Sequence, residues 1–519
     1  FWLKTSAGLP NLQTRPRHRT AMAAIMEEAM VALPQDEQVA HKLQNDGVDA
    51  VTTLFLASSA GSQELLGNAK YLNEPRRERS GESCSTVASE AELDADAGAL
   101  RLCGAVQKYA WGKPHDESLV AAMAAGQFSS DGAAKAAASS SSERFAELWL
   151  GTHRNGSSRA LPLSGCTGPQ QEQLLKDVID QDPEFWLGED CERGDLPYLL
   201  KVLSVHQALS IQAHPDKRLA EQLQRRSPEH YPDANHKPEI CIPLGHFEAL
   251  CGFRPTEEVR RHVCEVPELR ELCCGPHGPE GQDLRELFSR LMRSDPLVVR
   301  RQVGALVERL AAKGGRTPEE ELILVVERDY PGDVGVFGIY FLNYVRITPD
   351  MPNSFIYCAP NEPHAYLKGD AVECMAISDN VVRAGLTSKH KDVETLLDLL
   401  TYRDDLLPEL VGAGERVAPH VVLYNPPVDD FLVYEIDGPV PEGLHLPHAA
   451  IATCVSGAVS VTFQAAECPD GQSQAAAQAE GAGEGLQRLT TGHSVFSRAG
   501  SDLFVLGAEA GTRFFVASY

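Results

Sequence analysis

Three short segments hold the side chains best suited to chemistry. In the first, Ser210, Gln212 and His214 alternate with apolar residues and are followed by Pro215. Residues two apart in a β-strand face the same side, so these three side chains would project together from a strand. Taken alone, the same pattern also fits the polar outer face of an edge strand.

The second and third segments add further polar residues. Lys237 and Glu239 are two apart and can face one cavity, although a lysine–glutamate alternation is also typical of a solvated face. In the third segment His364 follows a proline, with Glu373 and Arg383 farther along the chain. A single histidine in such a position is usually a structural residue, so the three segments point to a site only when they are taken together.

Four of these residues could form a metal site. Gln212, His214, Glu239 and His364 supply an amide oxygen, two imidazoles and a carboxylate. Imidazole and carboxylate ligands suit zinc, and an added water would leave the open position typical of catalytic zinc sites. Because only one ligand is charged, the centre stays net positive and can polarise a carbonyl or hydroxyl group. The sequence therefore predicts one bound zinc ion.

Positive side chains accompany these segments although the chain is acidic overall. The formal net charge is -26, which disfavours a general role in nucleic-acid binding. Lys201, Lys237, Arg383 and Lys389 lie within or close to the same segments. Arginine binds phosphate through a bidentate fork and lysine as a point charge, so this group could bind a phosphorylated substrate.

The segments with polar residues lie in β-prone regions on both sides of a helical region. Short runs separated by glycine, proline and aspartate turns favour sandwich or jelly-roll architecture. Between them, Leu284, Leu287, Phe288 and Leu291 form one apolar stripe at helical spacing, and a similar stripe follows. Residues 255–328 are therefore predicted to form an inserted helical domain.

Composition sets further limits. No apolar run reaches the length of about eighteen residues that a membrane-spanning helix needs. The 13 cysteines form no C-x-x-C pair, which favours a reducing compartment over a disulfide framework. Low-complexity insertions at 121–142 and 465–485 are predicted loops. The acid-poor start of the chain is consistent with an organelle transit peptide and equally with an N-terminal extension that has no targeting role, and residues 1–100 receive no function.

Several blocks of the sequence closely resemble type I mannose-6-phosphate isomerases, the eukaryotic-type zinc enzymes of the cupin superfamily. The blocks occur in the family's order, at 109–112, 146–153, 196–201, 210–217, 231–239 and 363–387. The C-terminal part fits more loosely. The N-terminal extension, the two low-complexity insertions and residues 349–354 depart from the family pattern, but none of them includes a predicted ligand.

The resemblance implies a role for each site residue. The metal ligands that it implies are Gln212, His214, Glu239 and His364. The residues that it places in the catalytic cavity are Arg383, Glu373 and Lys389, with Arg383 beside the sugar. The residues that it places around the substrate and its phosphate are Lys201, Ser210, Lys237, Trp111 and Tyr366.

The implied reaction interconverts mannose 6-phosphate and fructose 6-phosphate through a cis-enediol and feeds GDP-mannose synthesis. Zinc would stabilise negative charge on oxygen, and a positioned acid/base would add roughly 10²–10⁴-fold. Glu373 and a zinc-bound water are both candidates for the base. Two alternatives remain: a non-catalytic cupin that binds a metal or a sugar, and an isomerase for another substrate such as glucose 6-phosphate.

The predicted fold is mainly β, with two cupin-like jelly-roll β-sandwich domains and an inserted α-helical domain. We expect a catalytic domain at 101–254 and 329–390, a helical domain at 255–328 and a C-terminal sandwich at 391–519, after an extension at 1–100. We expect a monomer whose partner is a small sugar phosphate, with no nucleic acid and no membrane. The expected location is the cytoplasm, or a plastid if the N-terminal segment is a transit peptide.

Overall fold

A computed structural model describes residues 98–127, 143–163, 172–274, 278–465 and 486–519. The chain divides into two units, 1–89 and 90–519, and every described residue belongs to the second. The predictions for the N-terminal extension and for most of both low-complexity insertions therefore lie outside the described residues.

The first insertion begins with a helix rather than a loop. Helix α4 (Leu119–Gly126) extends into it, and Ser118 caps the helix by accepting a hydrogen bond from the backbone N–H of Ala121. Alanine has the highest helix propensity, so an alanine-rich stretch can form a helix although its low complexity predicted a loop.

The strands that carry the predicted site belong to one eleven-stranded sheet. Its main path is β16-β13-β10-β14-β8-β5-β2; β11 pairs with β12 and β14, and β9 pairs with β14 and β15. Neighbouring strands run antiparallel, as in a jelly roll. The strands are β2 (Ala105–Gln107), β5 (Glu147–Leu150), β8 (Tyr198–Val205), β9 (Ile211–Ala213), β10 (Glu239–Pro243), β11 (Phe247–Phe253), β12 (Leu342–Ile347), β13 (Ser354–Cys358), β14 (His364–Ala376), β15 (Val382–Gly385) and β16 (Val411–Ala413).

Strand β14 connects the two parts of this sheet. Its first residues pair with β11, and with β9 through His364 opposite Gln212. The residues from Gly369 onward pair with β8, and those from Ala371 to Met375 also pair with β10 on the other side. Gly369 has φ +127°, and a Cβ there would lie 2.6 Å from the carbonyl oxygen of His246. Only glycine fits where the strand changes partners. One strand thereby carries both His364 and Glu373 to the site.

The C-terminal strands form most of a second sandwich. A nine-stranded sheet has the order β17-β18-β19-β26-β21-β24-β1-β6-β7, and a four-stranded sheet has the order β20-β25-β22-β23. Val461 and Val505 of the smaller sheet share a buried cluster with Val495 and Phe514 of the larger one. The strands are β1 (Ala99–Cys103), β6 (Arg159–Pro162), β7 (Gln173–Leu174), β17 (Glu415–Ala418), β18 (Val421–Tyr424), β19 (Leu432–Ile436), β20 (Val440–Leu446), β21 (Ala450–Ser456), β22 (Ala458–Ala465), β23 (Gln487–Thr490), β24 (Ser494–Ser497), β25 (Ser501–Ala508) and β26 (Arg513–Ser518).

The sheets do not follow the expected division of the chain at residue 391. Strands β1, β6 and β7 come from the N-terminal part of the described chain, yet they extend the nine-stranded sheet, where β1 pairs with β24. The physical reason is burial, because Leu100 and Leu102 on β1 enter the same core as Phe496 on β24. The nearby strands β3 (Lys113–Pro114) and β4 (Arg144–Phe145) form a separate two-stranded sheet.

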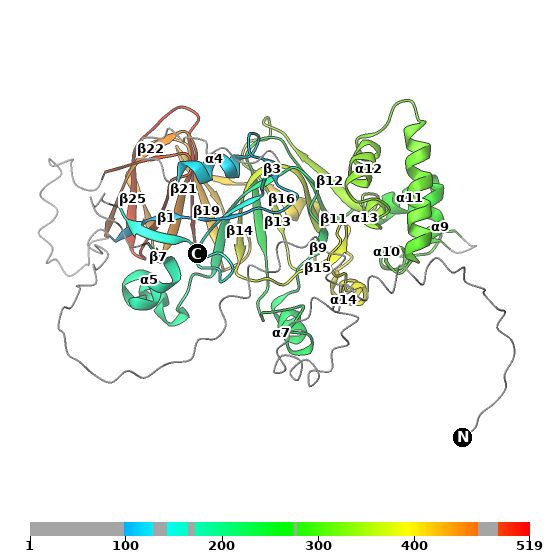
Figure 1. The fold of residues 1–519 in the computed structure, drawn as a ribbon, viewed down its shortest axis with the longest axis horizontal. Coiled ribbons are helices and arrows are strands. Elements are labelled where there is room, and N and C mark those ends of the chain that lie inside the picture. The colour runs from blue at the N-terminus through cyan, green and yellow to red at the C-terminus, as the bar shows by residue number, and fades with distance from the viewer. Residues whose placement is uncertain (1–97, 128–142, 164–171, 275–277, 466–485) are drawn as a thin grey trace, which may run out of the picture. The chain divides into compact units, whose positions relative to one another are not determined.

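A helical module follows β11, as predicted. Its helices are α8 (Thr256–Glu265), α9 (Pro267–Cys273), α10 (Leu284–Met292), α11 (Pro296–Ala311) and α12 (Pro318–Asp329), and α13 (Gly335–Gly338) leads from it to β12. The predicted stripe of Leu284, Leu287, Phe288 and Leu291 is the buried face of α10. It shares a core with residues of β9, β11, β14 and β15, and Figure 1 shows α9–α12 grouped beside β11 and β12. The mainly β fold with a helical insertion is thus confirmed.

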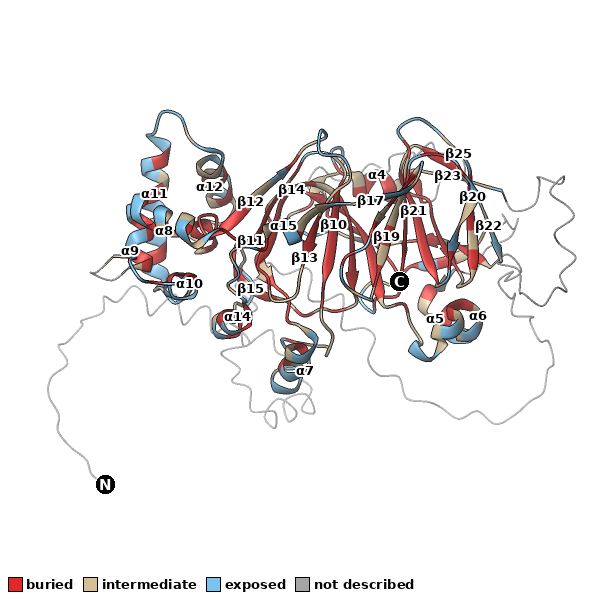
Figure 2. Cartoon of the chain, turned by 180° about the vertical axis from the view of Figure 1, so that it is seen from behind, coloured by how far each residue is buried: buried red, intermediate tan, exposed pale blue. Residues whose placement is uncertain are grey.

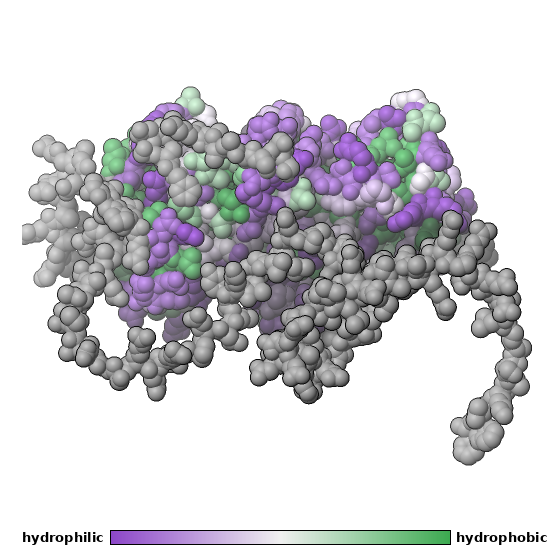
Figure 3. Space-filling view, viewed as in Figure 1, coloured by the Kyte–Doolittle hydropathy of each residue, from purple (hydrophilic) through white to green (hydrophobic). Residues whose placement is uncertain are grey.

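The remaining helices border the sheets. They are α5 (Leu175–Gln181), α6 (Pro183–Leu187), the 3-10 helix η2 (Gly188–Arg193), α7 (Lys217–Arg226), α14 (Val393–Leu399) and α15 (Leu407–Leu410). In Figure 2 most strand residues are buried, whereas these α-helices each have one buried and one exposed side. Hydrophilic residues, with apolar ones between them, cover much of the described surface in Figure 3. No helix in the described part of the chain is long and apolar enough to span a membrane.

Candidate active site

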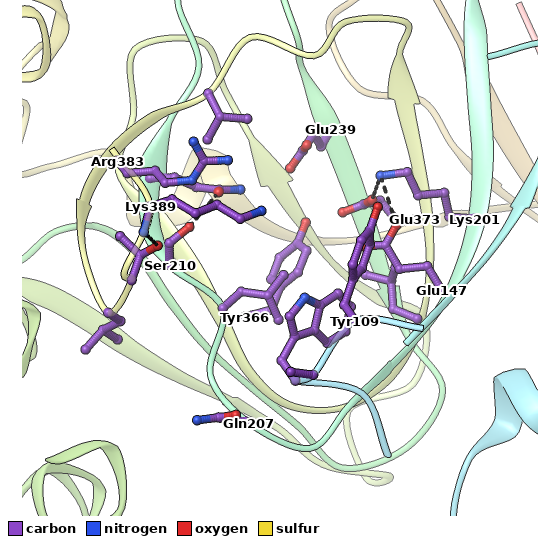
Figure 4. Close-up of a pocket in the computed structure, with 18 of the residues that line it drawn as sticks. Tyr109, Glu147, Lys201, Gln207, Ser210, Glu239, Tyr366, Glu373, Arg383 and Lys389 are labelled. Carbon is purple, nitrogen blue, oxygen red and sulfur yellow. Dashed lines mark hydrogen bonds and ion pairs between the residues drawn. The ribbon is translucent and has the colours of Figure 1, made fainter. Parts of the chain in front are cut away.

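A cavity of about 540 Å³ brings the three segments together (Figure 4). Ten of the twelve residues predicted for the site line it: Trp111, Lys201, Ser210, Gln212, Lys237, Glu239, Tyr366, Glu373, Arg383 and Lys389. The other two, His214 and His364, both lie beside Glu239. Strands β8, β9, β10, β14 and β15 carry most of these side chains, so the site is built on the eleven-stranded sheet rather than on loops alone.

Donor atoms of His214, Glu239 and His364 converge beside this cavity. Ligand atoms of the three residues lie within 4.8 Å of one another. Nε2 of His214 is 3.3 Å from Oε1 of Glu239, and Nε2 of His364 is 3.4 Å from Oε2. Both Nε2 atoms and Oε2 of Glu239 are buried without a hydrogen-bond partner among the described residues. Buried polar atoms are almost always satisfied, so three orphaned atoms at one place fit a bound metal ion.

Strand pairing brings the fourth predicted ligand to this group. Gln212 on β9 is the register partner of His364 on β14, and its side chain lines the cavity. The Ser210 hydroxyl donates a hydrogen bond to Gln212 Oε1 at 3.0 Å, which restrains the amide. Ile211 and Ala213, on either side of Gln212, are buried in the core, as the alternation predicted.

Hydrogen bonding and charge prepare the histidines for a metal. His214 Nδ1 donates to the backbone carbonyl of Asn380 at 2.8 Å, so Nε2 keeps its lone pair. Burial lowers the pKa of His214 to about 4, so this imidazole is neutral at pH 7. Burial opposes protonation of His364 as well, but Cys358 and Glu239 raise its pKa. A cation can displace the proton that His364 and Glu239 would otherwise hold.

One side of the cavity carries a buried lysine between two carboxylates (Figure 4). Lys201 Nζ lies 2.8 Å from Oε2 of Glu373 and 3.8 Å from Oε2 of Glu147. Burial opposes the charge on Lys201, but the carboxylates of Glu373 and Glu147 raise its pKa. Burial also raises the pKa of Glu373, although Lys201 opposes that shift. A carboxyl group with a raised pKa suits a group that gives and takes a proton.

The other side of the cavity carries Arg383 and Lys389 (Figure 4). Neither side chain forms an ion pair with a carboxylate of the described residues, and Thr387 and Ser388 line the cavity next to Lys389. Burial lowers the pKa of Arg383, and burial together with the charge of Arg383 lowers that of Lys389. Two neighbouring cations without a counter-ion form a binding site for an anion. Lys237 differs, because its Nζ lies 3.2 Å from Oε1 of Glu239.

The cavity also includes residues that the sequence did not predict for the site, among them Glu147, Trp149 and Asp379. Glu147 faces Lys201 and accepts a hydrogen bond from Trp149 Nε1. Glu147 and Trp149 are two apart in one of the matching blocks, so the alternation that singled out other residues could have found them. Asp379 lines the cavity with its carboxylate 3.2 Å from Nε2 of His153, a contact that no local spacing indicates.

Known proteins match this chain over most of its length. The model of the phosphomannose isomerase type I catalytic domain matches residues 99–256, and that of the type I helical insertion domain matches 256–342. Mannose-6-phosphate isomerase from Bos taurus is 42% identical over 389 residues, which cover 70% of this chain and 88% of the relative. The Homo sapiens protein is 40% identical over 395 residues, 70% of this chain and 89% of the relative. Mannose-6-phosphate isomerase 1 from Arabidopsis thaliana is 37% identical over 376 residues, 69% of this chain and 83% of the relative.

Solved structures share the fold. A mutant of phosphomannose isomerase from Salmonella typhimurium has a TM-score of 0.65 and 28% identity, covering 81% of this chain and 99% of that one. A mannose 6-phosphate isomerase bound with zinc and yttrium has a TM-score of 0.64 and 28% identity, covering 81% of this chain and 100% of that one. These matches confirm the resemblance that the sequence blocks indicated: the chain belongs to the type I phosphomannose isomerase family.

Proposed function

We propose that the chain is a zinc-dependent aldose–ketose isomerase that interconverts mannose 6-phosphate and fructose 6-phosphate. The observation that carries this proposal is that three metal-binding atoms and two cations, none of them paired among the described residues, meet at one cavity. Relatives named mannose-6-phosphate isomerase in mammals and in Arabidopsis thaliana support the choice of substrate. Supply of mannose 6-phosphate for GDP-mannose synthesis is the cellular role that we propose.

Gln212, His214, Glu239 and His364 would hold one zinc ion per chain. Imidazole nitrogens and carboxylate and amide oxygens are donors that zinc accepts in catalytic sites, where one position stays open. When bound, the ion supplies Lewis acidity that stabilises negative charge on a sugar oxygen. A structure of a mannose 6-phosphate isomerase bound with zinc and yttrium supports the choice of metal.

Charge divides the cavity between the two ends of the substrate. Among the described residues Arg383 and Lys389 have no carboxylate partner, so we assign the phosphate to them. Lys201 and Lys237 already face carboxylates, and they suit the hydroxyl groups of the sugar better than its charged phosphate. Trp111 lines the cavity with an aromatic side chain that can cover the sugar.

Glu373 is the residue that we assign to proton transfer. Its raised pKa lets it take a proton from C2 of the open-chain aldose and return the proton to C1. The proton of the C2 hydroxyl moves to the oxygen on C1, so the cis-enediol becomes the ketose without gain or loss of atoms. Lys201, 2.8 Å from Glu373, holds the carboxylate in place during both steps.

The spacing of the site residues agrees with variants of the Salmonella typhimurium enzyme. Those variants replace a lysine and a histidine 13 residues apart, a lysine and a glutamate two apart, and a glutamate and an arginine ten apart. The same three intervals separate Lys201 from His214, Lys237 from Glu239, and Glu373 from Arg383. The agreement supports these six residues as members of the site.

The proposal is tested by measuring fructose 6-phosphate formation from mannose 6-phosphate. Purified protein should turn over, lose activity on treatment with a chelator and regain it when zinc is added. Turnover that a chelator does not affect would contradict the metal mechanism, and zinc binding without turnover would support a non-catalytic cupin. Glucose 6-phosphate, the C2 epimer, is the control substrate, and a preference for it would overturn the assigned substrate.

A further inference from the structure

The two metal-binding histidines are oriented in different ways. His364 Nδ1 lies 3.3 Å from the backbone carbonyl oxygen of Glu362, only two residues earlier in the chain. His214 Nδ1 instead donates to the backbone carbonyl of Asn380, in the loop between β14 and β15. Asn380 is fully buried. The position of this loop therefore sets the ring plane and the tautomer of His214.

The Asn380 loop is held in place by an aspartate that does not line the cavity. The carboxylate of Asp233 accepts hydrogen bonds from Ser378 Oγ at 2.8 Å, from the backbone N–H of Asp379 at 2.7 Å and from Asn380 Nδ2 at 3.1 Å. The backbone carbonyl of Asp233 accepts from Asn380 Nδ2 at 2.8 Å. The backbone carbonyl of Asn235 also accepts hydrogen bonds, from Ser378 Oγ at 3.1 Å and from Asn380 Nδ2 at 2.9 Å. We call these contacts of residues 233–235 with 378–380 the Asp233 clamp.

The Asp233 clamp joins parts of the chain that carry different ligands. Asp233 lies on the segment that leads into β10, which begins with Glu239. The loop at 378–380 contacts His214 and leads into β15, which carries Arg383. One carboxylate thus ties together the backbone that positions two metal ligands and a cation of the cavity.

We propose that Asp233 is a positioning residue for the metal site, which acts through Asn380 to hold His214 in the orientation that binds zinc. This inference rests on the proposed function, because it takes His214 as a zinc ligand. Groups that orient a metal-bound histidine are typically worth 10–100-fold in metal affinity. Asp233→Asn keeps the shape of the side chain but replaces one accepting oxygen with an NH2 group. This NH2 group would face a donor, either the Ser378 hydroxyl or the Asp379 backbone N–H, so that hydrogen bond would be lost and the clamp would open.

Zinc affinity tests the proposal independently of activity. In competition with a chromophoric chelator, Asp233→Asn should bind zinc about 10–100-fold more weakly than the native chain. The visible absorption of the Co²⁺-substituted variant should also change, because it reports ligand geometry. Asp404→Asn is the matched control: Asp404 accepts from the backbone N–H and the hydroxyl of Thr256, away from the ligands, and this variant should keep native zinc affinity.

The outcomes separate the two proposals. Zinc binding by the native chain and by Asp233→Asn with equal affinity would overturn the positioning role and leave the proposed function intact. Absence of zinc binding by the native chain would overturn both. An equal loss of affinity in Asp404→Asn would show a general effect of destabilisation and would also overturn the positioning role. If Asp233→Asn does not fold, Ser378→Ala is tested in its place, because it removes only one hydroxyl from the clamp. This variant should bind zinc several-fold more weakly than the native chain. Unchanged zinc affinity in Ser378→Ala would overturn the proposal.

Discussion

His214, Glu239 and His364 show at the scale of single residues why this site is built to bind a ligand. A buried polar group without a partner costs about 1–3 kcal/mol of folding stability. Three such atoms lie together here, unpaired among the described residues. Apolar side chains at these positions would avoid this cost of burial. The three polar atoms are therefore best explained by a bound ion that all three contact.

His364→Ala should remove bound zinc and nearly all activity, because it deletes one of four proposed ligands. The fold should persist, since its core is formed by the apolar clusters around the site. Metal analysis and circular dichroism measure the two effects. His262→Ala is the control, because His262 Nδ1 donates to the Tyr340 carbonyl outside the cavity and should not affect zinc. Full zinc content in His364→Ala would exclude His364 as a ligand.

Arg383→Ala should keep zinc but lower kcat/KM by a factor of about 10²–10³, because it removes a cation assigned to the phosphate and so weakens binding of the transition state relative to free substrate. Arg383 has no described carboxylate partner, so its removal leaves no buried charge uncompensated. Arg383→Lys should keep part of the activity, because lysine retains the charge without the bidentate fork. Steady-state kinetics on the zinc-loaded variants measure both effects, and a near-normal kcat/KM in Arg383→Ala would refute the assigned role.

At the scale of elements, the end of the helical insertion supports the turn after β15. Asp333 Oδ1 accepts from the backbone N–H groups of Gly335 and Leu386, each at 2.7 Å, and Oδ2 pairs with Lys391 Nζ at 3.2 Å. Leu386 has φ +54°, which few non-glycine residues adopt. A Cβ on Gly385 would lie 2.6 Å from Gly335 Cα, so the two backbones touch. The turn that carries Lys389 is thus held by α13.

Asp333→Asn should raise KM for mannose 6-phosphate about tenfold, the effect of losing roughly 1.4 kcal/mol of binding. Its kcat should change less, because the Asp333 contacts hold the turn with Lys389 and not the metal ligands. Steady-state kinetics give the two constants. Asp295→Ala, which removes the N-terminal cap of α11, controls for loss of helix stability. An unchanged KM would show that α13 does not position the phosphate-binding turn.

The pair Glu268–Arg309 makes the stability of the helical module depend on pH. Arg309 donates to Glu268 through Nε at 2.9 Å and Nη2 at 2.8 Å. Burial opposes ionisation of Glu268, but these hydrogen bonds lower its pKa. The stabilisation is therefore present above the unfolded pKa of about 4.3 and is lost as pH falls through the lower folded pKa.

Glu268→Gln should reduce the free energy of unfolding by about 1–2 kcal/mol at neutral pH, as expected for hydrogen bonds to a charged group. The reduction should become smaller as the pH is lowered below the folded pKa, where the native carboxyl is protonated as well. Urea unfolding of both proteins over this range measures the difference. A difference that does not change with pH would mean that ionisation of Glu268 is not the cause.

For the molecule as a whole, the eleven-stranded and nine-stranded sheets share one core. Leu200 and Val372 of the first belong to the same buried cluster as Phe496 and Phe515 of the second. The hydroxyl of Tyr198, on β8, donates to the carbonyl of Ala517, on β26, at 2.9 Å. Elements that share a core unfold cooperatively, so the two β regions should behave as one unit.

Zinc should therefore raise the unfolding temperature of both β regions together. A ligand that binds only the folded state stabilises it by about 2.7 kcal/mol at a hundredfold excess over Kd. Differential scanning calorimetry with zinc and with a chelator measures the shift. A second transition that zinc leaves unchanged, assigned to residues 391–519 by hydrogen exchange, would show that the shared core does not couple the two regions.

Local periodicity predicted which side chains of a segment share one face, and the combination of segments and their resemblance to a known family predicted that these faces form a site. The alternation at 210–214 and at 237–239 and the apolar stripe at 284–291 depend on the periods of strand and helix, which the sequence contains directly. Strand partners and loop contacts are different, because they depend on which surfaces meet in three dimensions. The pairing of β1 with β24, the contact of Glu147 with Lys201 and the Asp233 clamp join residues far apart in the chain. Only the tertiary structure decided them, since burial of the shared core, and not spacing along the chain, selects these partners.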